Sequence, residues 1–325
     1  MDSTDISILP SINPDGFAKA KLGSCTRKVG MLNAEGKDLD QDFPSWSDYQ
    51  RFIQDQNFDA FGGGRQAETL SLMEWSLSPF VLSANFRDGE VVVTYPFDHQ
   101  RKGVRKTENL TPDEDVFQHL AGTYASNHKT MANSTKCYRR AENGFANGAS
   151  WLRTRNGRAL HGSLKDFSYL FTSNLEVSIG LNCCNYPKSS YLVKEWENNK
   201  QSLLSYMEQV HRGVKGRVTV EGGGPISGVD IITWNPDGTK RLKNVATSDR
   251  GEFWKILIPG VSRRSPYKIQ AYLEDCGQLG SGKIFQSEKH DVYISYEKPL
   301  TVRNLNLRHV GYCSGNTLAG LYNQV

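Results

Sequence analysis

The sequence predicts two domains: a larger α/β domain with a mixed sheet over residues 1–212 and a small antiparallel β-sandwich over residues 213–309. Three observations lead to this architecture. Residues 79–98 contain two β-branched or apolar strand segments, and segments with helical spacing lie on both sides of them. After Gly213 the pattern changes to short alternating strands separated by turns. The length of 325 residues also suits two domains, and residues 310–325 are expected to form a tail.

Residues 79–98 are expected to hold central strands of the larger domain. Phe80-Val81-Leu82 begins a buried strand, Arg87-Asp88-Gly89 forms a tight turn, and a second strand covers Glu90–Tyr95. Ligands of α/β proteins often bind beyond the ends of such strands. A plain strand–turn–strand within a mixed sheet is the alternative interpretation.

Three further segments of this domain are predicted to be helices. The first begins at Gln66–Thr69, and the third covers Glu195–His211 and ends before Gly213. The second begins with Thr111 as the cap and Pro112 at the first helical position. The residues expected to face the core are Leu70, Met73 and Trp75 in the first helix, Val116, Leu120 and Tyr124 in the second, and Leu203, Leu204, Met207 and Val210 in the third.

The smaller domain is predicted from short strands that alternate apolar and polar residues. Gly- and Pro-containing turns, such as Pro236-Asp237-Gly238 and Pro259-Gly260, separate them. The predicted strands are Arg217–Val220, Val229–Trp234, Phe253–Ile258, Tyr267–Leu273, Val292–Tyr296 and Val302–Leu307.

Composition excludes several classes of protein. Hydrophobic residues make up 38% and charged residues 23% of the chain, as in globular proteins with a packed core. No apolar run approaches the roughly 18 residues that a membrane span needs. The formal net charge of +4 is small, and no block of Lys and Arg stands out, so nucleic acid is not an expected partner.

The cysteines and the chain start bear on the cellular compartment. No Cys-x-x-Cys pair occurs, which argues against a zinc ribbon or a thioredoxin-like motif, and adjacent Cys183 and Cys184 could each pair elsewhere. Sequons at Asn109 and Asn133 are compatible with a secreted glycoprotein. The acidic, polar start is unlike a signal peptide, and the strand-like Ile6–Leu9 follows almost at once, which suggests a fragment or an alternative start.

A series of motifs over nearly the whole chain carries a resemblance to a known family. In order they are NPDG (13–16), NAEGKDL (33–39), SANFRDG with YPFD (83–98), NGASW (147–151), DFSY (166–169), CCNYP (183–187) and HRGVKG (211–216). The chain resembles the zinc metallocarboxypeptidases of the N/E, or regulatory, branch, which includes carboxypeptidases D, E, M and N. The spelling KDLDQDF resembles the non-catalytic third domain of carboxypeptidase D. The resemblance implies a carboxypeptidase-like α/β/α domain, truncated at its N-terminus, and a transthyretin-like β-sandwich in a secreted or extracellular protein.

The positions that carry chemistry in this family hold other residues here. The resemblance aligns the third zinc ligand, a histidine in active members, with Arg87, and the general base, a glutamate, with Gly180. A guanidinium has no lone pair for a metal, and glycine has no carboxylate to activate water. The positions that bind the substrate carboxylate align with Met31, Asp40 and Gln41, where Asp40 would repel a carboxylate.

The family's other two zinc ligands form an HxxE motif ahead of NPDG, and no histidine of this chain has a glutamate three residues on. We therefore expect no metal and no cofactor, whereas active relatives use zinc. Two binding positions are retained. Asp98 pairs with the basic C-terminal side chain of the substrate in active members, and Tyr169 closes over it. A capping carboxylate and a half-buried aromatic are the alternatives for these two residues. Glu176 aligns with a further glutamate of the family but lies too far along its strand to replace the base.

The sequence thus predicts a pseudoenzyme that binds a peptide or protein ligand, with ligands carrying basic side chains among the candidates. One alternative is an active zinc carboxypeptidase that releases C-terminal Lys or Arg, with HxxE supplied by an upstream segment. A second alternative is a structural domain of a multi-domain receptor.

Overall fold

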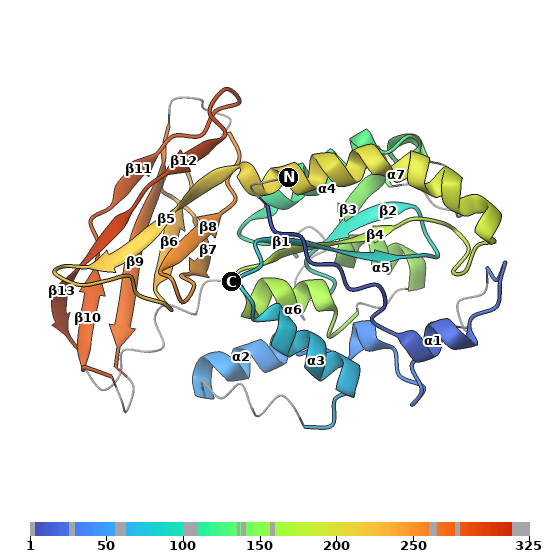
Figure 1. The fold of residues 1–325 in the computed structure, drawn as a ribbon, viewed down its shortest axis with the longest axis horizontal. Helices are drawn as coiled ribbons and strands as arrows, with labels where there is room; N and C mark the ends of the chain where they lie inside the picture. The colour runs from blue at the N-terminus through green and yellow to red at the C-terminus, as the bar shows by residue number, and fades with distance from the viewer. Residues whose placement is uncertain are drawn as a thin grey trace.

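The structure is a computed structural model that describes residues 4–25, 30–55, 63–99, 109–134, 137, 141–156, 160–259, 265–276 and 280–313. Figure 1 shows an α/β domain beside a domain built of strands alone. The helices of the α/β domain are α1 (Pro14–Lys19), α2 (Trp46–Asp55), α3 (Ala67–Ser76), α4 (Glu114–Asn127), α5 (Gly148–Asn156), α6 (Leu164–Phe171) and α7 (Leu192–Met207). Its strands are β1 (Leu82–Arg87), β2 (Val92–Tyr95), β3 (Phe145–Asn147) and β4 (Leu175–Gly180).

The sheet of the α/β domain is mixed, as predicted. Its order is β1-β4-β2-β3, with β4 parallel to β1 and antiparallel to β2. The strands on either side of Gly89 therefore flank β4 and do not pair with each other, and the second begins at Val92 rather than at Glu90. Helices α4 and α7 cover one face of the sheet, and α6 with α2 and α3 lies on the other (Figure 1).

Strand β1 was expected to be buried, and this was wrong. Its residues are mostly half-buried, and Phe86 is exposed. The reason is position: within the described part of the chain, β1 pairs with β4 alone and so forms one edge of the sheet. By contrast, β4 and β2 lie inside the sheet and are buried along their whole length.

The second predicted helix is observed as α4, with Val116, Leu120 and Tyr124 buried as expected. Its start differs from the prediction. The helix begins at Glu114, and its N-cap is Asp113, whose side chain makes no capping hydrogen bond because it is engaged elsewhere.

The predicted inward faces of α3 and α7 were partly wrong. In α3, Met73 is buried, but Leu70 and Trp75 are exposed. In α7 the buried face is polar: its buried residues are Asn198, Asn199, Ser202 and Tyr206. The apolar side chains of α7 remain half-buried or exposed.

In its described residues, the second domain contains nine strands around its own apolar core. They are β5 (Gly213–Val220), β6 (Asp230–Trp234), β7 (Arg241–Ala246), β8 (Glu252–Lys255), β9 (Tyr267–Asp275), β10 (Lys283–Gln286), β11 (His290–Val292), β12 (Leu300–Val302) and β13 (Leu305–Tyr312). Most ladders are antiparallel, but β12 and β13 run parallel to β5, which the prediction of an antiparallel sandwich did not include.

Several strand boundaries of this domain differ from those predicted. Strands β7 and β10 were missed, and β11 ends at Val292 instead of Tyr296. The predicted strand Val302–Leu307 is interrupted, because Arg303 and Asn304 turn to bond the backbone of β5. Strand β13 continues to Tyr312, into the stretch expected to be a tail, while residues 314–325 lie outside the described part.

All six cysteines form disulfides: Cys25–Cys184, Cys137–Cys183 and Cys276–Cys313. The adjacent Cys183 and Cys184 thus pair with different partners. Of the two sequons, Asn133 is exposed, whereas Asn109 is buried and its amide nitrogen donates to the His99 carbonyl at 3.0 Å. Among the described helices, none combines the length and apolar character that spanning a bilayer requires.

Candidate functional site

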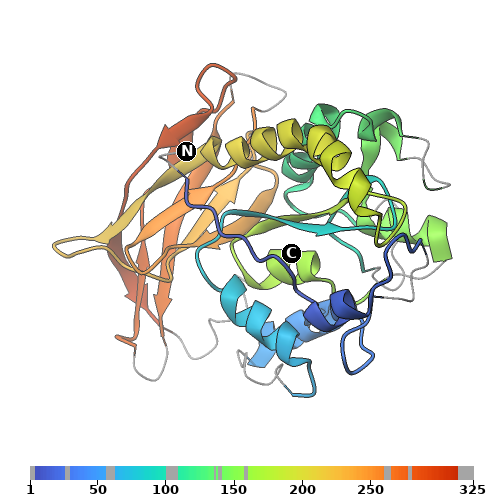
Figure 2. The same ribbon diagram turned by 45° about the vertical axis from the view of Figure 1, so that its right-hand side comes forward.

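A groove with a volume of about 1420 Å³ lies beside the edge strand β1. One wall is the extended segment Thr4–Asn13, which crosses in front of the sheet in both views (Figures 1 and 2). The opposite wall is β1 with the turn that follows it. The third wall is α7, which contributes Leu203, Leu204 and Met207. The apolar residues of α7 that were expected in the core therefore line this groove.

An ion cluster centred on Arg87 lies at the end of β1, in the wall of the groove. The guanidinium contacts Asp40 Oδ2 at 3.3 Å and Glu90 Oε1 at 2.5 Å. The second oxygen of Glu90 accepts a hydrogen bond from the Trp151 indole at 2.6 Å, and the Leu164 amide donates to Asp40 Oδ1 at 3.3 Å. The cation is thus held between two carboxylates that are themselves fixed by the α/β domain.

The charges of this cluster depend on each other. Burial alone would lower the pKa of Arg87, but Glu90 and Asp40 outweigh it and keep the pKa above its usual range. Burial raises the pKa of Asp40 to about 6, although Arg87 opposes the shift. Arg87 therefore stays cationic, and Asp40 is the group of the cluster that can take up a proton in mildly acidic solution.

Gly180 lies directly beside Arg87, because the two residues are register partners in the parallel ladder of β4 and β1. A Cβ atom at Gly180 would meet the Glu90 carbonyl oxygen at 2.6 Å and its Cγ at 2.8 Å. The backbone of Glu90 thus fills the space that a side chain at position 180 needs. A carboxylate could be introduced there only if the Glu90 segment moved.

The structure brings Met31, Asp40 and Gln41 together in the lining of the groove, with Arg87. The Met31 side chain is exposed, and the Gln41 amide donates to Asp38 Oδ2 at 2.6 Å. Within this set Arg87 is the only cation, and both Asp40 and Glu90 share it.

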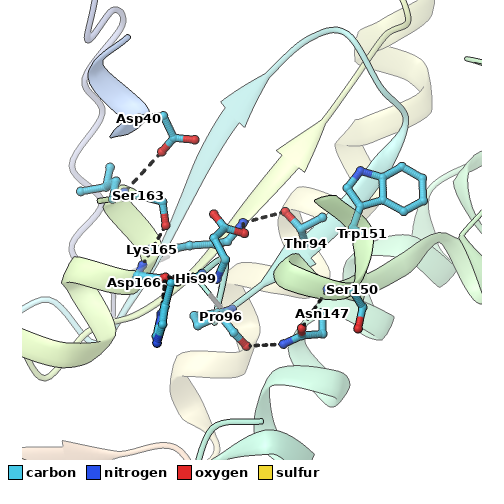
Figure 3. Close-up of polar contacts among 12 residues, drawn as sticks. Asp40, Thr94, Pro96, His99, Asn147, Ser150, Trp151, Ser163, Lys165 and Asp166 are labelled. Atoms are coloured by element: carbon cyan, nitrogen blue, oxygen red, sulfur yellow. Dashed lines mark hydrogen bonds and ion pairs between the residues drawn. The ribbon is translucent and has the colours of Figure 1, made fainter. Parts of the chain in front are cut away.

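Asp98 lies behind the groove and is not part of its lining. Its carboxylate pairs with the Lys165 ammonium at 2.8 Å, and the two side chains are only 2% and 1% exposed. The same ammonium donates to Thr94 Oγ1 at 2.9 Å, a contact visible in Figure 3. The neighbouring Asp166 accepts from the backbone of Asp98 and from the His99 ring.

Tyr169 is not near the groove. Its ring is fully buried, and its hydroxyl donates to Asp113 Oδ2 at 2.8 Å. Asp113 in turn pairs with Lys255 of β8 at 2.6 Å and accepts from the Lys243 amide of β7 at 3.0 Å. Tyr169 thus belongs to the junction between the two domains, where it cannot close over a ligand in the groove.

Glu176 is a further carboxylate at the groove, on β4. It is buried and accepts hydrogen bonds from Ser83 at 3.0 Å and Ser168 at 2.9 Å through one oxygen. Burial raises its pKa to about 7, although both serines oppose the shift. Near neutral pH this side chain is therefore close to half protonated.

The residues present do not fit a zinc ion of the family type. At the aligned ligand position Arg87 is protonated and committed to Asp40 and Glu90, and a guanidinium offers no lone pair. No three His, Cys, Asp or Glu side chains of the described residues come together as a metal site requires. No chemical step is therefore assigned to a metal here.

Three residues of these clusters were not found from the sequence: Glu90, Lys165 and Asp113. Glu90 and Asp113 gave no pattern of their own, because each looks like a surface residue at the start of a strand or helix. Lys165 carried a weak signal, since it lies in the apolar stretch Leu164–Phe171 that forms a buried helix. A lysine in such a place needs a buried partner.

Comparison with known proteins identifies the family of the chain. A profile of the zinc carboxypeptidase family matches residues 1–202. The chain is 40% identical over 266 residues to carboxypeptidase D of Drosophila melanogaster, covering 80% of this chain and 18% of that protein. It is 38% identical over 304 residues to carboxypeptidase M of Mus musculus, covering 90% and 63%, and 33% identical over 285 residues to the carboxypeptidase N catalytic chain of Homo sapiens, covering 80% and 58%. The chain spans less than two thirds of each of these relatives. It belongs to the zinc carboxypeptidase family.

Proposed function

We propose that this chain is a non-catalytic member of the family that binds an extended peptide or protein segment in the groove beside β1. The observation that carries the proposal is the Arg87 cluster. A permanent cation, paired with Asp40 and Glu90, occupies the position aligned with a zinc ligand. Next to it, Gly180 has no carboxylate, and Glu90 leaves no room for one.

The groove has the features of a peptide site. Within the described residues, β1 has one strand partner, so its other edge can accept the main chain of an added strand. The facing side chains of α7 are apolar and contribute a surface that gains from being covered. Main-chain pairing would then give affinity, and the apolar wall would select side chains.

We also infer that the chain works in the secretory pathway or outside the cell, and that its second domain is the transthyretin-like domain of this branch. Three disulfides that use every cysteine fit an oxidising compartment. The exposed Asn133 is the sequon that can carry a glycan.

Catalysis and metal binding are tested together. Elemental analysis of the purified chain is expected to find no stoichiometric zinc, and a peptide ending in Arg is expected to stay intact. The double variant Arg87→His/Gly180→Glu should remain inactive, because Glu90 leaves no room for the new side chain at position 180 and the positions aligned with the carboxylate-binding residues still hold Met31, Asp40 and Gln41. About one zinc per chain with chelator-sensitive hydrolysis would overturn the proposal in favour of an active carboxypeptidase.

Binding is tested by calorimetry with matched peptides ending in Arg as the free acid and as the amide. We expect equal and weak binding of the two, since Asp40 offers nothing to a carboxylate. Leu204→Asp, in the groove wall, should abolish binding. Val193→Asp, on the same helix but outside the groove lining, is the control and should not.

A further inference from the structure

The pair of Lys165 and Asp98 stands out among the buried groups of the α/β domain. Lys165 extends from the first turn of α6 to β2, where its ammonium reaches Asp98 Oδ1 at 2.8 Å and Thr94 Oγ1 at 2.9 Å. Both charged side chains are almost completely buried. A buried ammonium is stable only beside an anionic partner. Which of the nearby carboxylates needs the Lys165 ammonium depends on the other hydrogen bonds that each carboxylate accepts.

The two neighbouring carboxylates are stabilised in different ways. Asp166 accepts hydrogen bonds from the amides of Asp98 and His99 and from the His99 ring, all between 2.9 and 3.1 Å. The Asp98 carboxylate has the Lys165 ammonium as its ion partner. Burial raises the pKa of Asp98, and Lys165 opposes that shift. Asp98 is therefore the carboxylate that depends on a cation.

The backbone of Gly148 lies directly against the Asp98 carboxylate. Gly148 approaches it so closely that a Cβ atom there would collide with Asp98 Oδ1. Lys165 lies in α6, where the residues from Leu164 to Leu170 are all buried, and its ammonium reaches Asp98 and Thr94. A buried carboxylate whose ion partner reaches it along an aliphatic stem suits the charge and length of a lysine side chain.

We infer that Lys165 is a built-in ligand: it fills the Asp98 pocket from within the chain and so prevents the groove from recognising a basic side chain of a bound peptide. This inference rests on the proposed peptide-binding function. Asp40 and Glu90 also have an internal cation, because both pair with Arg87. A peptide in the groove is then selected by its apolar side chains and its main chain, and a cationic side chain adds nothing.

Chemical rescue tests whether the pocket accepts an alkylammonium. Lys165→Ala removes the stem and ammonium and is expected to lower Tm by about 5–10 °C, as for a broken buried pair. Adding n-propylammonium, which has the three carbons and the ammonium that the change removes, should restore at least half of that loss with saturation. Propanol, which has a similar shape without the charge, should not, and neither should n-propylammonium in Lys165→Ala/Asp98→Asn.

A second measurement tests specificity directly. Two peptide amides that differ only in lysine or norleucine are titrated into the wild-type chain, and their affinities should agree within about twofold. In Lys165→Ala the lysine peptide should bind at least tenfold more tightly than the norleucine peptide. A wild-type preference for lysine that is lost in Asp98→Asn would overturn the inference, and so would a folded Lys165→Ala that n-propylammonium does not stabilise.

A neutral double variant and the independence of the Tm readout from peptide binding complete the experiment. If Lys165→Ala does not fold, the double variant Lys165→Met/Asp98→Asn replaces the pair with neutral groups of similar size. It should bind both peptides as the wild type does, and a tenfold loss of affinity specific to the lysine peptide would contradict the inference. Rescue of Tm requires neither peptide binding nor the absence of catalysis. A successful rescue in a protein that cleaves peptides would therefore remove the proposed function and leave the Asp98 pocket established.

Discussion

The Arg87 cluster and the Asp113 cluster are both built from charged residues far apart in the sequence, yet they differ in what surrounds them. At the domain junction, Asp113 and Lys255 are 0% and 2% exposed, and both oxygens of Asp113 have donors. In the groove wall, Arg87 and Asp40 are each 25% exposed and border a large open space. The sealed cluster joins two domains, whereas the open one leaves polar atoms available to a ligand.

The difference shows that burial, more than the presence of ion pairs, separates a structural cluster from a candidate site. Tyr169 illustrates this: the sequence placed it at the ligand site, and its hydroxyl is instead one of the donors that complete the Asp113 cluster. Removing a member of the sealed cluster should therefore affect folding, and changing the open one should affect binding.

The largest expected effect comes from Asp113→Ala. The change removes the ion partner of the buried Lys255 ammonium and the carboxylate that accepts from the Tyr169 hydroxyl, so the free energy of unfolding should fall by about 3–5 kcal/mol. Chemical denaturation measures it. Asp291→Ala, which breaks an ion pair that is about half exposed, is the control and should leave the transition where it is. Equal transitions for the two variants would mean that the junction does not depend on Asp113.

A second, smaller effect is expected from Glu176→Gln, and it depends on pH. Burial raises the pKa of Glu176 from 4.5 to about 7, so between these values the folded chain holds a proton that the unfolded chain has released. Stability is therefore lost as the pH rises through this window. Glutamine removes the loss and should raise the free energy of unfolding by up to about 3 kcal/mol at pH 8, with no gain at pH 4.

Denaturation at both pH values measures this change, and Glu35→Gln on an exposed loop controls for the removal of one negative charge. A gain that is the same at pH 4 and pH 8 would contradict the role assigned to burial. The result also extends the comparison of the Arg87 and Asp113 clusters, because Glu176 is a carboxylate of the groove that accepts hydrogen bonds but has no ion pair among the described residues.

The smallest effect is expected from Gly180→Ala, which tests how tightly the backbone packs beside the Arg87 cluster. The added methyl group would meet the Glu90 backbone and should cost about 1–3 kcal/mol of stability. Gly311→Ala, on β13 with open space around it, is the matched control and should be nearly neutral. A Gly180→Ala variant as stable as the control would show that Glu90 yields easily, and that a larger residue at position 180 can be accommodated.

The sequence by itself determined the family, and it predicted the order of the two domains and the altered site residues. Short motifs such as NPDG and YPFD depend on residues next to each other in the chain, so they can be read without coordinates. The buried residues of α4 and the turn at Gly89 were likewise predictable from local spacing and backbone preference. The sequence did not predict which apolar residues of α3 and α7 are buried, because that depends on the elements that pack against these helices.

Only the tertiary structure decided how the charged residues pair. Lys165 and Asp98 lie far apart in the sequence, as do Arg87 and Asp40, and Lys255 reaches Asp113 from the other domain. Asp98 and Tyr169 look like binding residues from their motifs, yet the fold gives each an internal partner. The physical reason is that a charge buried on folding must be matched by whatever group the fold brings to it, and neither burial nor that group is encoded in the neighbouring sequence.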